Sequence, residues 1–243
     1  MNTAALFEAI KAGDAATVDS ILTARPAAAG ASDADGLSAL TVAAYHGQWP
    51  IVERIRAAGP ELDRYESAIV GDTDRLRVLL DEAEGERAVE RESPGKAGAN
   101  GRDPIGEPVN ERSSDGFTAL HLAAFFGRPE VIRMLLDRGA DPNPWATGGL
   151  YVQPLHSAVA GAHEEGAQLL IQGGADVNSA QRLGYTPLMG AAQNGLAATV
   201  DLLLARGADP MARNDDILTA AELAERAGHL ELAERIRAAG GSR

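Results

Sequence analysis

Residues 118–127 read TALHLAAFFG, and this pattern returns along the chain at a nearly constant spacing. Related segments are QPLHSAV at 153–159, TPLMGAAQNG at 186–195 and TAAELA at 219–224. The equivalent leucines are 35 and then 33 residues apart, at Leu120, Leu155 and Leu188. Self-similarity at such a period predicts structural units stacked in a row.

A second block repeats in phase with the first. It reads GADPN at 139–143, GADVN at 174–178 and GADP at 207–210. Together the two blocks resemble the ankyrin repeat, a unit of about 33 residues with a T-P-L-H-x-A signature. The resemblance implies two helices joined by a turn and followed by a β-hairpin or loop in each unit. It also implies a role in binding other proteins.

Each part of the pattern has a physical reason. A threonine at the helix start can cap free backbone N–H groups, and a proline at the next position fits the first helical turn. Gly127 and Gly195 can take the left-handed conformation that ends a helix. Aliphatic residues at helical spacing then predict the second helix of the unit, as at 131–136.

The N-terminal half follows the pattern less closely. SALTVAAYHG at 38–47 predicts a first helix, and degenerate versions occupy 5–14 and 65–72. Gly47 and Gly71 are 24 residues apart, which is too short for a hairpin between them. We therefore expect a direct link between helices around Pro60.

The predicted fold is an all-α repeat solenoid that forms a single domain over 1–243. We expect about seven units, the last of which is a charged C-terminal cap: 1–32, 33–62, 63–112, 113–145, 146–180, 181–213 and 214–243.

Residues 84–108 are a surplus over the repeat period. They are rich in Gly, Pro, Glu and Arg and carry few aliphatic side chains, so they cannot bury enough apolar surface to fold alone. We expect a flexible loop inserted in the third unit. One hypothesis is that this insert folds back over the binding surface and inhibits it.

Composition limits the classes of function. The formal net charge is −13, which disfavours nucleic acids and anionic membranes and favours a basic protein partner. The chain has no cysteine, no uninterrupted apolar run long enough to span a membrane, and no basic stretch preceding an apolar one near Met1. We expect a cytoplasmic monomer.

Histidines are the most tempting catalytic candidates. His121 and His156 stand at the H of the signature, where the resemblance implies bonds to the backbone. No histidine pair has zinc-site spacing, and neither a Walker-type phosphate loop nor a G-x-S-x-G motif is present. The sequence predicts no enzyme activity, catalytic residue, metal or cofactor. A hydrolase remains an alternative without a motif behind it.

The binding residues are predicted from the family's usual contact positions, namely the hairpin tips and the ends of the first helices. Large exposed aromatic side chains often anchor interfaces. Alternatively, Phe125 or Phe126 packs against the insert or a neighbouring hairpin, and Trp49 covers the edge of the core. The predicted partner-binding set is Tyr45, His46, Ile69, Phe117, Phe125, Phe126, Trp145, Tyr151, Tyr185, Gln193 and Asn194.

Overall fold

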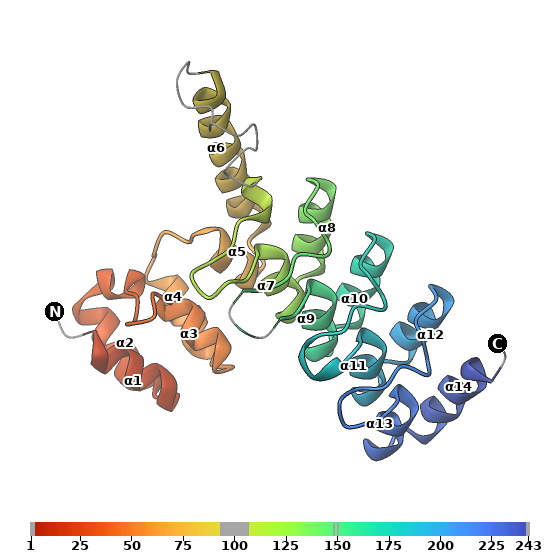
Figure 1. Ribbon diagram of the computed structural model, residues 1–243. Coiled ribbons are helices and arrows are strands. Elements are labelled where there is room, and N and C mark those ends of the chain that lie inside the picture. Colours follow the sequence, from red (N-terminus) through yellow and green to blue (C-terminus); the bar gives the residue numbers. More distant parts are fainter. Residues whose placement is uncertain (1–2, 93–106, 148, 150, 242–243) are drawn as a thin grey trace.

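A computed structural model describes residues 3–92, 107–147, 149 and 151–241, without the side chains of 89–92. The described residues form an elongated row of helix pairs, with the two ends of the chain at opposite ends of the row (Figure 1). This architecture confirms the predicted all-α ankyrin-type solenoid.

The helices of the described residues pair in chain order, each short first helix with a second helix. They are α1 (Ala4–Ala12), α2 (Ala15–Ala24), α3 (Ala39–Tyr45), α4 (Trp49–Ala57), α5 (Arg64–Val70), α6 (Thr73–Glu92), α7 (Ala119–Phe125), α8 (Pro129–Asp137), α9 (Pro154–Ala160), α10 (Glu164–Gln172), α11 (Pro187–Gln193), α12 (Ala197–Ala205), α13 (Ala220–Arg226) and α14 (Leu230–Gly240). Short 3₁₀ turns occur at Pro26–Gly30, Pro108–Asn110 and Arg182–Gly184.

The predicted helix boundaries are confirmed at the signature segments. The hydroxyls of Thr118, Thr186 and Thr219 accept hydrogen bonds from backbone N–H groups three residues on. Gly127 and Gly195 follow α7 and α11 with φ of 65° and 69°. Local sequence therefore sets where these helices begin and end.

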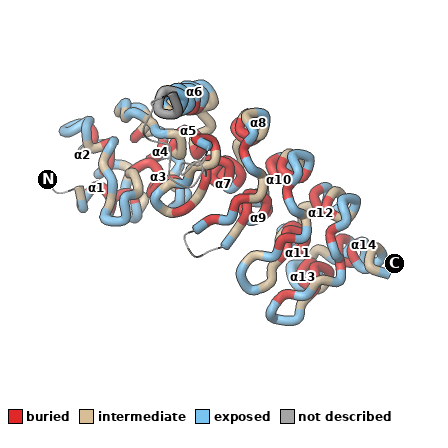
Figure 2. Tube along the Cα trace, turned by 45° about the horizontal axis from the view of Figure 1, so that its top comes forward, coloured by how far each residue is buried: buried red, intermediate tan, exposed pale blue. Residues whose placement is uncertain are grey.

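A continuous apolar core runs along the whole row (Figure 2). The equivalent leucines of the first helices are buried in every case: Leu40, Leu120, Leu155 and Leu188. Buried alanines, such as Ala123 and Ala158, lie beside them and let neighbouring helices approach closely. Each unit thus shares its core with the unit before and the unit after.

The segments between the helix pairs are loops with little strand pairing. Single antiparallel bridges join Ser32 to Ser38 and Arg112 to Thr118, and the described residues contain no longer strand. In the first of these loops, the side chain of Asp33 accepts hydrogen bonds from the backbone N–H groups of Asp35 and Leu37. The carboxylate closes the turn in place of further backbone pairing.

The direct link around Pro60 is confirmed, because residues 58–63 alone connect α4 to α5. Longer loops make four of the other connections between pairs, at 25–38, 138–153, 173–186 and 206–219.

The predicted loop at 84–108 is wrong at both ends. Helix α6 continues to Glu92 and projects beyond its neighbours (Figure 1), and Pro108 and Val109 are buried in a 3₁₀ turn. Residues 81–92 are mostly Glu, Arg, Ala and Asp, and the strong helix formers Glu, Arg and Ala among them allow a helix to continue without tertiary contacts. Residues 93–106 lie outside the described residues.

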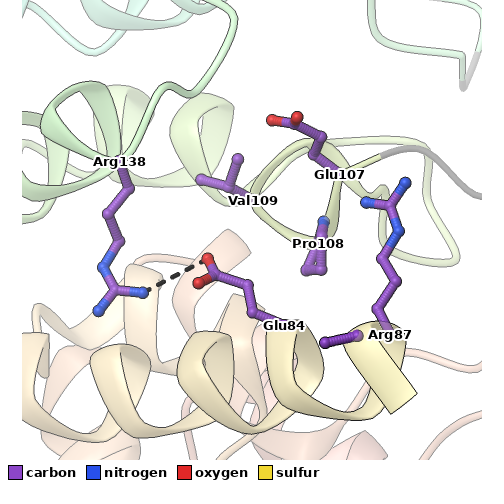
Figure 3. Close-up of a pocket in the computed structure, with 7 residues that line it drawn as sticks. Glu84, Arg87, Glu107, Pro108, Val109 and Arg138 are labelled. Carbon is purple, nitrogen blue, oxygen red and sulfur yellow. Dashed lines mark ion pairs between the residues drawn. The ribbon is translucent and has the colours of Figure 1, made fainter. Parts of the chain in front are cut away.

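The projecting helix is fastened to the row by Arg138. Its guanidinium pairs with Asp81 at 2.6 Å and with Glu84 at 3.6 Å. Arg138 and Glu84 border a hollow of about 290 Å³ between α6 and the 3₁₀ turn at Pro108 (Figure 3).

Candidate functional site

Four aromatic side chains gather where α3 and α4 approach α7 and α8. Tyr45, Trp49, Phe125 and Phe126 border an open hollow of about 720 Å³, which we call the aromatic hollow. Its other lining residues are Ala44, Gly47, Glu53, Gly127, Arg128, Gly161 and His163.

Phe126 is the centre of the cluster. Tyr45 stacks on it with ring centroids 5.9 Å apart and an angle of 21° between the planes. Trp49 and Phe125 meet it edge to face, at 5.7 and 5.2 Å. Both arrangements are favoured by the aromatic quadrupole. Phe126 is only 8% exposed, whereas Tyr45, Trp49 and Phe125 are 38, 36 and 42% exposed.

The helix ends explain this placement. Tyr45 and Phe125 are the last residues of α3 and α7, and Phe126 is the next residue before the glycine that ends the turn. Trp49 is the first residue of α4, just after the turn at Gly47 that follows α3. These positions lie at the edge of the core, where the fold leaves side chains free to meet solvent or a partner.

Tyr45 also makes a polar contact. Its hydroxyl donates a hydrogen bond of 2.5 Å to Oδ2 of Asp115, which lies in the loop before α7. Burial is the main cause that raises the pKa of the Tyr45 hydroxyl, and the hydrogen bond to Asp115 adds to it. The phenol therefore remains a donor at neutral pH.

Arg128 supplies a cation at the rim. Its Nε donates a hydrogen bond of 2.7 Å to the carbonyl oxygen of Ile69, near the C-terminal end of α5. Its guanidinium carbon lies 4.9 Å from the centre of the Trp49 ring, within cation–π distance. Burial lowers the pKa of this guanidinium, although arginine stays charged at neutral pH.

His163 closes the far side of the hollow. Its ring occupies the place that a Cβ on Gly127 would need, so the glycine and the imidazole fit together. Partial burial lowers the pKa of His163, opposed by a hydrogen bond with the backbone of Phe125. The imidazole therefore acts here as a packing and bonding group between two units.

His121 and His156 have the structural role that the signature implies. Nδ1 of each ring accepts a hydrogen bond from a backbone N–H, of Thr118 and Gln153 respectively. Nε2 of each contacts a carbonyl oxygen of the next loop, of Val152 at 3.1 Å and of Ser179 at 3.0 Å. A carbonyl only accepts, so Nε2 carries the proton. Burial lowers the pKa of both to about 4.

The structure brings together three of the predicted binding residues, Tyr45, Phe125 and Phe126, and buries one of them. Phe126 is covered by the other aromatic rings of the hollow, so its prediction as an exposed contact is wrong. The prediction of Ile69 as an exposed contact is also wrong, since Ile69 is fully buried between the stacked first helices. The alternative considered for the phenylalanines, packing against the insert or a neighbouring hairpin, does not describe Phe126, which is covered by aromatic residues at helix ends.

The other predicted residues lie outside the hollow. Trp145 and Tyr151 are exposed on the loop between α8 and α9. Phe117 and Tyr185 are half-buried against the core. The remaining three are exposed at helix ends: His46, Gln193 and Asn194.

Trp49 and Arg128 are site residues that the sequence reasoning missed. The position of Trp49 directly after the turn that follows Tyr45 was a usable signal, because that turn brings the end of one helix close to the start of the next. Nothing local indicates Arg128, whose contacts are with residues 59 and 79 positions earlier in the chain.

The hollow is chemically suited to binding. Its carboxylate, Glu53, pairs with Arg56 at 3.3 Å, and its imidazole is held by the backbone. The described residues contain no group of His, Asp and Glu arranged to hold a metal ion. None of the described helices combines the length and apolar character that a membrane span requires.

Comparison with known families identifies the repeat. The family described as ankyrin repeats (3 copies) matches residues 150–214, and the single ankyrin repeat matches residues 115–145. The second match contains Asp115, Phe125 and Arg128, which lie at or beside the aromatic hollow.

Curated relatives match the same type of sequence. Human neurogenic locus notch homolog protein 4 is 43% identical over 95 residues, which are 39% of this chain and 5% of that protein. The Drosophila melanogaster ankyrin repeat and KH domain-containing protein mask is 42% identical over 99 residues, 40% of this chain and 2% of that protein. Mouse ankyrin repeat and SOCS box protein 16 is 36% identical over 105 residues, which are 40% of this chain and 23% of that protein. The similarity thus covers less than a quarter of each of these relatives.

Proposed function

The chain is an ankyrin-repeat protein, and from this premise we propose that it is a scaffold that binds a protein partner at the aromatic hollow. Ankyrin repeats generally mediate protein–protein interaction. The open side of the stacked first helices and the loop tips are the surface that we propose for contact.

One observation carries the proposal. The chain has ten aromatic residues of the types Phe, Tyr and Trp, and four of them meet at this hollow. Three of the four remain more than a third exposed although they contact one another. Exposed aromatic clusters in a concave site are typical hot spots of protein interfaces.

Loop residues extend the proposed surface. Trp145 and Tyr151 are exposed on the loop between α8 and α9, and both offer flat apolar area with a polar atom at the edge. The net charge of −13 favours a basic partner and faster association at low salt. The aromatic side chains would then supply affinity, and the acidic surface would steer the encounter.

We propose no catalytic role for the chain. The arrangement of Glu53 and His163 supports this view, because each is already engaged by a neighbouring group. Inhibition by residues 84–108 stays a separate prediction, since 93–106 lie outside the described residues. Deleting 93–106 would test it, and increased partner binding is the expected result.

Phe125→Ala is the variant that tests the binding proposal. Phe125 is exposed and its ring contacts Phe126 alone among the aromatic residues, so its loss should change the surface more than the fold. Leu230→Ala is the matched control, because Leu230 is an exposed apolar residue on α14, far along the row.

A partner can be identified by quantitative capture from lysate and then purified for titration calorimetry. We expect Phe125→Ala to weaken its affinity about tenfold or more, which corresponds to at least about 1.4 kcal/mol. Leu230→Ala should leave affinity unchanged. An affinity of Phe125→Ala within about twofold of the original would reject the hollow as the binding surface.

A further inference from the structure

The boundary between the second and third helix pairs differs from the other boundaries of the row. Only residues 58–63 connect α4 to α5, and no loop like 138–153 reaches over this boundary. Elsewhere neighbouring loops are tied by backbone hydrogen bonds, for example from Thr147 to Gly116 at 3.1 Å and from Asp215 to Leu183 at 3.0 Å. The described residues show no backbone hydrogen bond of this kind across the boundary, where the loop before α3 contributes a side-chain hydrogen bond from Ser38 to Glu66 and lies beside Ser114.

At several other boundaries, a side chain of one unit packs on the glycine that follows the first helix of the unit before it. Gln48 covers Gly13, Arg128 covers Gly71, His163 covers Gly127 and His229 covers Gly195. Gly47 has no such cover. Apart from its two neighbours in the chain, no described residue has an atom within 4 Å of the position that a Cβ on Gly47 would take. The residue expected to cover Gly47 is Asp72, which instead accepts a hydrogen bond from the backbone N–H of Arg75.

The second helices show the same difference. Side chains join α2 to α4 through Asp19 and Arg54, and α6 to α8 through Asp81 and Arg138. Helices α8 and α10, α10 and α12, and α12 and α14 are joined in turn by side chains. Between α4 and residues 73–86 of α6, the structure has no hydrogen bond or ion pair.

Solvent reaches this boundary from several sides. The aromatic hollow lies on one side, and a hollow of about 250 Å³ beside Ser38, Tyr65 and Asp115 lies on another. A third, of about 360 Å³, lies between Arg56 and Arg75. Few packed atoms therefore resist a change of angle here.

A small set of contacts bridges the boundary at its aromatic edge. Tyr45 and Trp49 reach past α5 to Phe126, and the Tyr45 hydroxyl donates to Asp115. Apolar packing of α3 on α5 continues the core beneath them. We propose that α1–α4 turn as one rigid block about a hinge at residues 58–63, and that Tyr45 with Asp115 and Phe126 is the latch that holds the block closed.

The inference goes beyond the proposed function and does not require it. Its consequence is that the aromatic hollow, whose walls come from both sides of the hinge, changes its width when the block turns. Binding and hinge motion can be measured independently, because the hinge is a property of the chain without a partner.

Pulsed electron–electron double resonance measures the distribution of distances between two spin labels, and a hinge motion widens that distribution. The chain has no cysteine, so pairs of introduced cysteines carry the only labels. Ser20→Cys with Asp137→Cys spans the hinge from α2 to α8. Asp137→Cys with Glu234→Cys spans an equal number of units from α8 to α14 without crossing it. All three positions are exposed.

The expected result is a wider distance distribution across the hinge than across the control span, because a hinge lets the two blocks adopt more than one angle. Tyr45→Phe, which keeps the ring and removes the hydroxyl, and Asp115→Ala, which removes the acceptor, should each widen the first distribution and leave the second unchanged. Asp201→Ala, which removes the ion pair with Arg235 on α14, should leave the first unchanged. Equal widths in the unaltered chain would overturn the hinge. A wide first distribution that neither latch variant alters would overturn the latch.

Discussion

The side-chain oxygen of Asn143 accepts a hydrogen bond of 2.7 Å from the backbone N–H of Asp176, across the boundary between two helix pairs. The amide nitrogen of the same side chain donates to the carbonyl oxygen of Gly174 at 3.1 Å. Asn178 repeats both bonds with Asp209 and Gly207. The repeated asparagine of the GADPN block thus ties each loop to the next.

Asn143→Ala should therefore destabilise the chain by about 1–2 kcal/mol, because two backbone groups lose their partners. Asn143→Asp should lower the free energy of unfolding by less than Asn143→Ala. It keeps an acceptor for the N–H of Asp176 and loses only the donor to the carbonyl oxygen of Gly174. Urea denaturation gives the free energy of unfolding. Gln193→Ala, at an exposed helix end, is the control, and a loss from Asn143→Ala no greater than from that control would contradict the prediction.

Arg128→Met tests the guanidinium at the rim of the hollow. Methionine keeps much of the apolar stem but removes the hydrogen bond to Ile69 and the cation–π contact with Trp49. We expect a loss of about 1–2 kcal/mol in the free energy of unfolding. Trp49 fluorescence, read in a Trp145→Phe background, should also shift. Arg133→Met loses only an exposed ion pair with Glu165, so it should leave the fluorescence unchanged and cost less stability than Arg128→Met. Unchanged fluorescence in Arg128→Met would show that the cation–π contact is absent in solution.

Stability should fall on acidification because of His121 and His156. Their pKa is about 4 in the folded chain, whereas a free histidine has a pKa of about 6.5. Below pH 6.5 the unfolded chain binds protons that the folded chain does not, so stability falls as pH drops from 6.5 towards 4. Each histidine contributes up to about 3 kcal/mol to that loss.

The measurement is urea denaturation at several pH values, compared between the original chain and His121→Gln. The variant should be less stable at pH 7.5 but lose less between pH 6.5 and 4.5. Parallel losses in the two chains would show that His121 does not titrate as its burial implies.

Ile217→Gly should stabilise the protein. Ile217 has φ of 64° in a loop tip and is 68% exposed, so a β-branched residue holds a strained conformation with little packing in return. Glycine removes the strain at a cost in backbone entropy. We expect the free energy of unfolding to rise by up to about 1 kcal/mol, which a higher melting temperature would show. Met211→Gly, also at an exposed loop residue but without positive φ, should lower the melting temperature. A lower value for Ile217→Gly as well would show that the side chain stabilises the tip.

The sequence by itself determined the repeat and the helix starts and ends at the signature segments, and its family resemblance implied the roles of His121 and His156. These features depend on neighbours within a few residues or at the same place in the next unit, so a periodic pattern records them. The missing loop at Pro60 could also be predicted, because the distance from Gly47 to Gly71 leaves no room for it.

Only the tertiary structure decided which aromatic residues meet and which are covered. Phe126 and Ile69 occupy positions that are open in a regular stack. Tyr45 and Trp49 nevertheless cover Phe126, and two neighbouring helices enclose Ile69. The pairing of Tyr45 with Phe126 skips one unit, because Tyr45 ends α3 of the second pair and Phe126 follows α7 of the fourth. Angles between units arise from the sum of many packing contacts, and no local sequence signal encodes that sum.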